Sequence, residues 1–149
     1  MSAQDGFEDD LLELILTNAA APNVGDAGGL QPSAGAGSWH VSLLTAAPAE
    51  SVADQTTNEP SFTPYARQAV ARSGSGWTVA SGVGDNDSAI SFDEVTTGSG
   101  TITNFGLGFA STSTGDLKMV GALTSPSSLA VSAGIAPEFA AGDLDVSLD

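Results

Sequence analysis

The chain carries few side chains that could do chemistry. His40 is its single histidine, and it has no cysteine. A catalytic triad needs a base within hydrogen-bond reach of a nucleophile, but there is no G-x-S-x-G motif, and the residues around His40 alternate as in a plain strand. Without cysteine, neither a disulfide nor a thiolate zinc site can form. We therefore predict no catalytic, cofactor-binding or metal-binding residues, and no enzymatic activity.

Carboxylates are the most abundant reactive groups, with 18 aspartates and glutamates. Two of them could act as acid and base on a sugar, but no pair lies in a context that would raise the pKa of one member. The oxygen-rich segments 85–87 and 93–94 do not match the spacing of an EF-hand loop. Aspartate and asparagine also form turns through their own backbone. We predict a turn at 83–87, with a structural calcium ion as an open alternative.

The charge balance excludes two classes of partner. Only Arg67, Arg72 and Lys118 oppose the 18 carboxylates, giving a net charge of −15. Nucleic-acid affinity depends on cations that displace counterions from phosphates, and an anionic membrane would repel this chain. No apolar run is long enough to span a bilayer, and the first residues lack a positive signal-peptide region. We therefore expect a soluble protein, made in the cytoplasm, that binds neither nucleic acid nor membrane.

The length and composition indicate one small domain with a thin core. A chain of 149 residues is typical of a single domain. Leucine, isoleucine, valine and phenylalanine make up 33 of the 149 residues, or 22%, which is little above the level of about 20% below which charged chains stay unfolded. Burial against copies of itself, or against a larger surface, would therefore add needed stabilisation.

The N-terminal segment 5–18 is the one predicted helix. Asp5 and Glu8 have the spacing of a capping box, and Asn18 is a plausible end. Phe7, Leu11, Leu14 and Ile15 follow the spacing of one helical face, which Leu12 and Leu16 widen. A helix this short is not stable alone in water. It must pack on its own sheet or on another subunit, and we predict Phe7, Leu11, Leu14 and Ile15 as interface residues.

Short strand patterns fill the remainder of the chain. Two glycine- or proline-bearing segments, 19–37 and 46–64, are predicted to be long loops. Strand-like segments are predicted at 39–44, 65–72, 77–79, 89–92, 101–109, 117–123, 129–131, 135–139 and 144–148. With no helical pattern between them, the strands indicate an all-β fold, an antiparallel β-sandwich of jelly-roll or immunoglobulin-like order with a short N-terminal helix. Residues 1–149 are expected to form a single domain.

Several stretches together resemble a family of small virion proteins of tailed bacteriophages. They are LLELILTN (11–18), NVGDAGGLQPSAGAGSWHVSLLTAAP (23–48), YARQAVARS (65–73), ITNFGLG (102–108), GALTSP (121–126) and GIAPEFAAGDLDVSLD (134–149). The most specific parts are Pro64-Tyr65-Ala66-Arg67 and the C-terminal FAAGDLDVSLD. Pro64 departs from the glycine that members usually have before the tyrosine. Members are often labelled tail-fibre proteins, and similar proteins decorate the outer face of the capsid as trimers. The family carries no catalytic residues, so the resemblance transfers none.

The resemblance implies a structural protein of the virion, for which two placements are open. A compact chain without repeats and with strong acidity favours a capsid decoration protein, a homotrimer whose partner is the major capsid protein on the outer surface of the head. The alternative is a tail-fibre or baseplate component that contacts the host surface. In that case Trp39, Trp77 and Tyr65 would be candidates for stacking against a carbohydrate, although their strand positions favour packing in the core.

Overall fold

The computed structural model spans residues 1–149 and describes residues 3–22, 24–25, 28–52 and 54–148. By its internal contacts the chain divides into two compact units. Unit 1 comprises residues 1–38, 70–90 and 139–149, and unit 2 comprises residues 39–69 and 91–138. Each unit is therefore assembled from separate stretches of the chain, and that the whole chain forms one domain stays a prediction.

Unit 1 begins with the predicted helix, which starts differently from the expectation. Helix α1 runs Asp5–Leu12 and continues as a π-helical turn, η1, Glu13–Thr17. The N-cap is Gln4, whose carbonyl accepts hydrogen bonds from the backbone N–H groups of Phe7 and Glu8. The predicted capping box was wrong, because Asp5 already lies inside the helix and no side chain caps the N-terminus. Asp5 and Glu8 still place negative charge at the positive end of the helix dipole.

The helix ends at Asn18, as predicted, and a polar network holds that end. Asn18 adopts the left-handed conformation (φ 59°), and its side chain bonds to Ser33 in both directions, as donor to the carbonyl and as acceptor from the N–H. Arg72 donates to the carbonyl oxygens of Ile15 (2.7 Å) and Leu14 (2.5 Å) and to Ser33 Oγ (2.9 Å). A cation is favourable there because the last carbonyls of a helix lack partners within it.

Replacing Arg72 with alanine is expected to lower the free energy of unfolding by about 1–3 kcal/mol, because two helix carbonyls lose charge-assisted hydrogen bonds. Arg72→Lys should recover only part of the loss, since an ammonium group cannot reproduce the planar fork. Urea denaturation of the two variants beside the wild-type protein measures both effects. Equal stability of Arg72→Ala and wild type would show that water replaces the guanidinium without cost.

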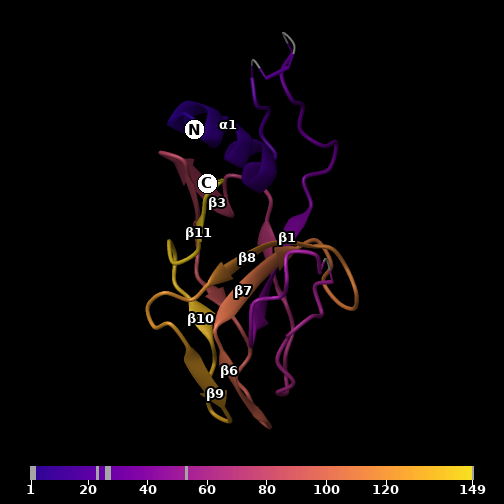
Figure 1. Ribbon diagram of the computed structural model, residues 1–149, viewed down its shortest axis with the longest axis vertical. Helices are drawn as coiled ribbons and strands as arrows, with labels where there is room; N and C mark the ends of the chain where they lie inside the picture. The colour runs from indigo at the N-terminus through magenta and orange to yellow at the C-terminus, as the bar shows by residue number, and fades with distance from the viewer. Residues whose placement is uncertain (1–2, 23, 26–27, 53, 149) are drawn as a thin grey trace. The chain divides into compact units, whose positions relative to one another are not determined.

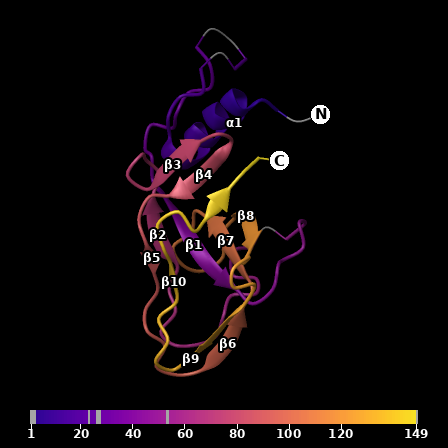
Figure 2. The ribbon, with the colours of Figure 1, turned by 90° about the vertical axis from the view of Figure 1, so that its left-hand side faces the viewer.

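The sheet of unit 1 packs beside the helix. It has three antiparallel strands in the order β11-β4-β3, with β3 at Trp77–Ala80, β4 at Val83–Asn86 and β11 at Asp145–Val146. The contacts place α1 against β3 and β4, as Figure 2 shows. Gly84 leaves room for the helix, because a Cβ at this position would lie 2.2 Å from Leu16 Cδ1. Leu12, Leu16, Trp77 and Leu144 are fully buried in this unit.

The predicted turn at 83–87 was wrong, because most of the segment forms strand β4. The turn lies two residues earlier, at Ser81 and Gly82, which both have positive φ (56° and 78°). Ala80 pairs with Val83 across this two-residue connection, the arrangement that suits the twist of a β-hairpin. The Asp-Asn-Asp composition suggested a turn, but the hairpin register decides which residues pair.

A second sheet, most of whose residues belong to unit 2, has the order β2-β1-β7-β8, where β1 is Ser38–Leu44, β2 Gln68–Ala71, β7 Asn104–Gly108 and β8 Leu117–Ala122 (Figures 1 and 2). Strand β7 pairs antiparallel with both β1 and β8. Strands β6 (Ser99–Ile102) and β9 (Leu129–Ser132) form a separate antiparallel pair. A further pair joins β5 (Ile90–Ser91) and β10 (Glu138–Phe139).

The segment 101–109, predicted as one strand, is broken at Thr103. Its backbone N–H donates to Leu44 (3.0 Å), its carbonyl accepts from Leu123 (2.8 Å), and its hydroxyl donates to the carbonyl of Thr45. These bonds separate β6 from β7, which belong to different sheets. The strand pattern itself carries no sign of the break, because the partners of Thr103 are far away in the sequence.

The long segment 46–64 is held on the sheet of unit 2 by Gln55. This side chain is fully buried; its amide donates to the carbonyl of His40 (3.0 Å) and accepts from the N–H of Ala110 (3.3 Å). A Cβ on Gly108 would lie 2.2 Å from Gln55 Oε1, so glycine at this strand position makes room for the amide.

The prediction of an antiparallel all-β protein with a short N-terminal helix is confirmed. The segments 39–44, 77–79, 117–123 and 129–131 match β1, β3, β8 and β9 closely. The strands at 65–72, 89–92, 135–139 and 144–148 are shorter than predicted.

Candidate functional site

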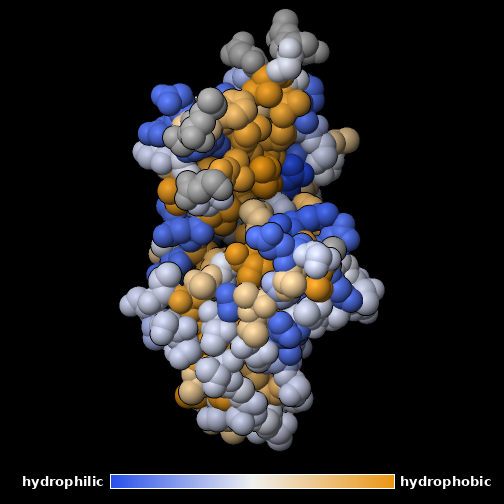
Figure 3. All heavy atoms as spheres, in the orientation of Figure 1, coloured by the Kyte–Doolittle hydropathy of each residue, from blue (hydrophilic) through white to orange (hydrophobic). Residues whose placement is uncertain are grey.

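The N-terminal helix has two apolar sides, and the structure of unit 1 buries only one of them. Leu12 and Leu16 are 0% exposed. Of the predicted interface residues, Phe7 is 45% exposed, whereas Leu11, Leu14 and Ile15 are partly exposed. The exposed side is therefore the one predicted to form an interface, and its role stays a prediction. Figure 3 shows apolar side chains gathered over α1 and the segment that follows it.

One further apolar residue of unit 1 is exposed, and no sequence pattern predicted it. Leu30, 41% exposed, lies in the predicted loop 19–37, where it forms an isolated bridge with Ala21. A lone leucine among glycines and prolines gives no periodic signal. The surrounding loop is also held by Gln31, whose side-chain amide donates to the carbonyl of Gly28.

His40 lies on β1 opposite Gly108 and is partly buried. Burial lowers the pKa of its imidazole, and the nearby positive charge of Arg67 lowers it further, while the backbone of Phe109 acts in the opposite direction. The ring is therefore neutral at pH 7. Its backbone carbonyl accepts the hydrogen bond from the Gln55 side chain, so this position has a structural role.

The acidic segment 85–87 serves the fold of unit 1. Asn86 is buried, and its side-chain amide donates to the carbonyls of Ser88 (2.9 Å) and Ala140 (2.8 Å) and accepts from the N–H of Leu144 (2.9 Å). This asparagine ties the C-terminal segment to β4. Within the described residues, no group of three or more histidine, aspartate or glutamate side chains is arranged to hold a metal ion.

Asp85 stands opposite Asp145 in the register of β4 and β11. Burial raises the pKa of Asp85, and a hydrogen bond and the negative charge from Asp145 raise it further. A carboxyl whose pKa is higher in the folded protein stabilises the fold only while it is protonated. Its contribution is therefore present below the unfolded-state pKa of 3.8 and is lost as the pH rises through the folded-state value.

Asp85→Asn is consequently expected to be more stable than the wild-type protein at pH 7, and this advantage should disappear near pH 3. Urea denaturation at the two pH values measures the difference. Asp93→Asn, at an exposed position, is the control for the loss of one negative charge. An advantage of Asp85→Asn that is the same at both pH values would contradict the repulsion between the two aspartates.

The aromatic residues considered for carbohydrate stacking mostly belong to the cores. Trp39 and Trp77 are 2% and 1% exposed. Trp39 stacks on Phe109 with 4.2 Å between the ring centroids. The Tyr65 ring packs against Phe62 and Phe92. The expectation that these strand positions favour core packing is confirmed for both tryptophans.

A buried ion pair in unit 2 joins two segments that sequence reasoning did not connect. The Arg67 guanidinium donates to both carboxylate oxygens of Glu59 (2.7 and 3.0 Å) and to the carbonyls of Ala110 (2.9 Å) and Ser113 (3.0 Å). The Tyr65 hydroxyl donates to the same Glu59 (2.8 Å); its pKa is raised by burial and by the Glu59 charge. In the sequence Arg67 was recognisable only as a cation, because a buried ion pair leaves no local pattern.

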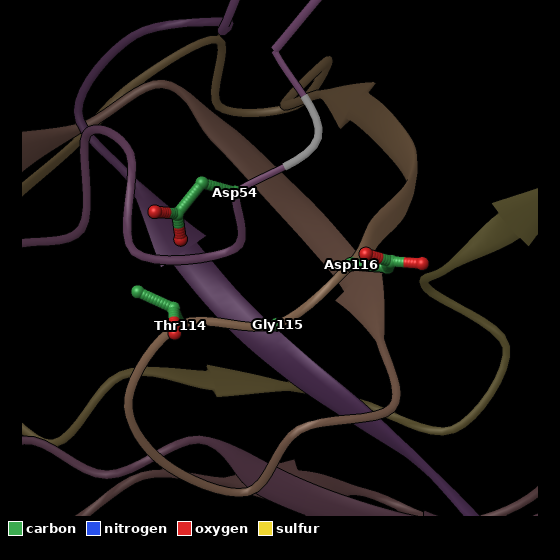
Figure 4. Close-up of a pocket in the computed structure, with 4 residues that line it drawn as sticks. All are labelled: Asp54, Thr114, Gly115 and Asp116. Carbon is green, nitrogen blue, oxygen red and sulfur yellow. The ribbon is translucent and has the colours of Figure 1, made fainter.

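A depression in unit 2 is lined by Asp54, Thr114, Gly115 and Asp116 (Figure 4). Its two carboxylates already have partners: Asp54 accepts from the N–H and hydroxyl of Thr56 (both 2.9 Å), and Asp116 pairs with Lys118 (2.7 Å). In Figure 4 the two carboxylates do not converge on a common point. The depression therefore offers no set of groups directed at a ligand.

The side chains described above thus serve in packing, in hydrogen bonds that hold the fold together and in exposed apolar surface. A sequence profile of the family described as podophage GP4 fiber I protein gp80 matches residues 8–147. The chain belongs to this family. Membership in the podophage fibre family confirms the resemblance to structural proteins of tailed-phage virions and makes this chain a virion structural protein.

The match to the podophage fibre family covers both units, from the first turn of α1 to the residue after β11. No curated protein matches the chain. Among the described residues, no helix has the length and apolar character needed to cross a membrane.

Proposed function

We propose that the chain is a subunit of a fibre on the particle of a tailed phage, that it works through contacts with other virion proteins, and that it is not an enzyme. The observation that carries the proposal is the match to a podophage fibre family over residues 8–147. Because the match includes both units, we assign the proposed role to the whole chain and not to one unit.

The chemistry of the side chains supports a role in assembly. Each cation is engaged within the chain: Arg67 with Glu59, Arg72 with helix carbonyls and Lys118 with Asp116. With a net charge of −15, the chain offers nothing to attract a phosphate backbone. Both tryptophans are buried, so they cannot stack on a host carbohydrate without unfolding. These features support a role in contacts with protein surfaces.

The test is the position of the protein in intact particles. Gold-labelled antibodies, or a reconstruction of the virion at a resolution that traces this chain, should place it on a fibre attached to the tail. Particles purified free of unassembled protein that contain no copy of the chain would contradict the proposal. So would hydrolysis of a substrate that is lost on replacement of one carboxylate.

A capsid decoration protein, bound as a trimer to the major capsid protein on the head surface, is the second candidate. It is favoured by the strands of only two to seven residues and by the absence of sequence repeats, because the shafts of elongated fibres are usually repetitive. A trimer in light scattering together with label over the whole head would support this candidate and contradict the fibre. A monomer, with label confined to the tail, would exclude it.

A further inference from the structure

We infer that the exposed apolar side of α1 and η1 is the docking surface for a different virion protein, whose own surface is an apolar groove edged by lysines and arginines. The inference rests on the proposed function, because it names the kind of partner that the virion protein binds. The docking surface is defined as Phe7, Leu11, Leu14 and Ile15, the apolar residues of α1 and η1 whose side chains are exposed or partly exposed.

The side of the helix formed by Leu12 and Leu16 is already used in the fold, whereas Phe7 is exposed and the other residues of the docking surface are partly exposed. Leu12 and Leu16 are fully buried, and Asp9 Oδ1 accepts a hydrogen bond of 2.7 Å from the N–H of Gly82. Glu8 lies over the same hairpin turn, since a Cβ on Gly82 would lie 2.5 Å from its Oε2. The helix is therefore held in one orientation before any partner arrives. A preorganised helix face loses little entropy on binding, which favours affinity.

The charges around the docking surface decide against a second copy of this chain. Besides Glu8 and Asp9, which lie at the hairpin turn, the helix carries Asp5, Asp10 and Glu13 and no lysine or arginine. Arg72 is the single lysine or arginine in the sequence of unit 1, and its guanidinium is bound to helix carbonyls and Ser33. Two copies meeting through this face would bring their carboxylates together, and like charges in contact disfavour a complex. A rim of lysines and arginines would instead pair with them.

An amphipathic helix that lays its apolar residues in a groove is a common way for proteins to recognise one another. Phe7 is the expected anchor, because it is the largest side chain of the docking surface and is 45% exposed. Aromatic anchors at the centre of an interface contribute more than their neighbours.

The first experiment locates the partner in intact particles. A photoreactive phenylalanine derivative replaces Phe7 in the phage genome, and crosslinked peptides are identified by mass spectrometry after illumination. The expected product joins position 7 to a different virion protein, at an apolar segment flanked by lysine or arginine. A crosslink to another copy of this chain, to an acidic or uncharged segment, or to no protein at all, would overturn the inference.

The second experiment tests the apolar and the charged parts of the surface separately. Phe7→Ser is expected to reduce the copies per particle by about tenfold, as for a residue that contributes strongly to an interface. Ile135→Ser, in unit 2 and 39% exposed, is the matched control and should be incorporated normally. The double variant Asp10→Lys/Glu13→Lys should also be lost from particles, whereas Asp93→Lys/Glu94→Lys, with the same change in net charge, should not.

Thermal denaturation of each purified variant must give a midpoint close to that of the wild-type protein, so that lost incorporation reports binding and not folding. If a variant fails this criterion, Phe7→Ala and Asp10→Asn/Glu13→Gln replace it. Normal incorporation of the docking-surface variants would overturn the inference while leaving the proposed function intact. Absence of the wild-type chain from particles would overturn the proposed function itself.

Discussion

Replacing Arg67 with methionine is expected to lower the free energy of unfolding by about 3–5 kcal/mol, because a buried carboxylate loses its counterion. Only 3% of the Arg67 side chain and 15% of the Glu59 side chain are exposed. Methionine fills part of the volume but donates no hydrogen bond. It leaves Glu59 and the carbonyls of Ala110 and Ser113 without the guanidinium.

Arg67 holds together the segment before β2 and the turn between β7 and β8, so its loss should also loosen both. Urea denaturation gives the stability change. Arg67→Lys should remain clearly destabilised, because an ammonium group cannot bridge both carboxylate oxygens and two carbonyls. A loss below about 1 kcal/mol in Arg67→Met, the range of surface ion pairs, would contradict the interpretation.

Lys118 provides the matched control within the same unit. It pairs with Asp116 at 2.7 Å, the same distance as the closest contact between Arg67 and Glu59, but the two side chains are 41% and 68% exposed. Lys118→Met should therefore change the free energy of unfolding by less than about 1 kcal/mol. Comparison of the two variants separates the effect of burial from that of ion pairing.

The second large effect is expected at the contact between the helix and β4. Leu16→Ala should cost about 2–5 kcal/mol, because it removes a fully buried side chain and leaves a cavity. Gly84→Ala should cost about 1–3 kcal/mol, since its methyl group would overlap Leu16 Cδ1. In the double variant, the methyl group at 84 enters the space that Leu16 vacated. The double variant should then be more stable than the sum of the two single changes implies.

The two tryptophans allow each unit to be followed separately. Trp77 belongs to unit 1 and Trp39 to unit 2, so a Trp39→Phe background restricts the fluorescence signal to the unit that contains the helix. Phe7→Ala, on the exposed side of the same helix, is the control and should have little effect on stability. Additive changes at positions 16 and 84 would show that the two residues do not share one packed site.

Much of the local structure was predictable because its causes are local. The apolar spacing of residues 7–16 predicted a helix, and Asn18, which tolerates the left-handed conformation better than most residues, predicted where it ends. Alternation predicted β1 and β8, since side chains of a strand point to opposite faces in turn. The charge of −15 and the absence of cysteine also follow from composition alone. They were sufficient to argue against nucleic-acid binding and to exclude disulfides.

Tertiary structure decided what depends on partners distant in the sequence. Spacing placed Phe7, Leu11, Leu14 and Ile15 on one stripe that Leu12 and Leu16 widen, but only packing on the sheet of unit 1 selected Leu12 and Leu16 for burial. The same stripe could have been buried from its other edge, because periodicity records which residues share a face and not what covers them. Arg67 became a structural residue only when folding brought Glu59 and the carbonyls of Ala110 and Ser113 to its guanidinium. Desolvation and hydrogen bonding act through space, and a linear pattern does not record them.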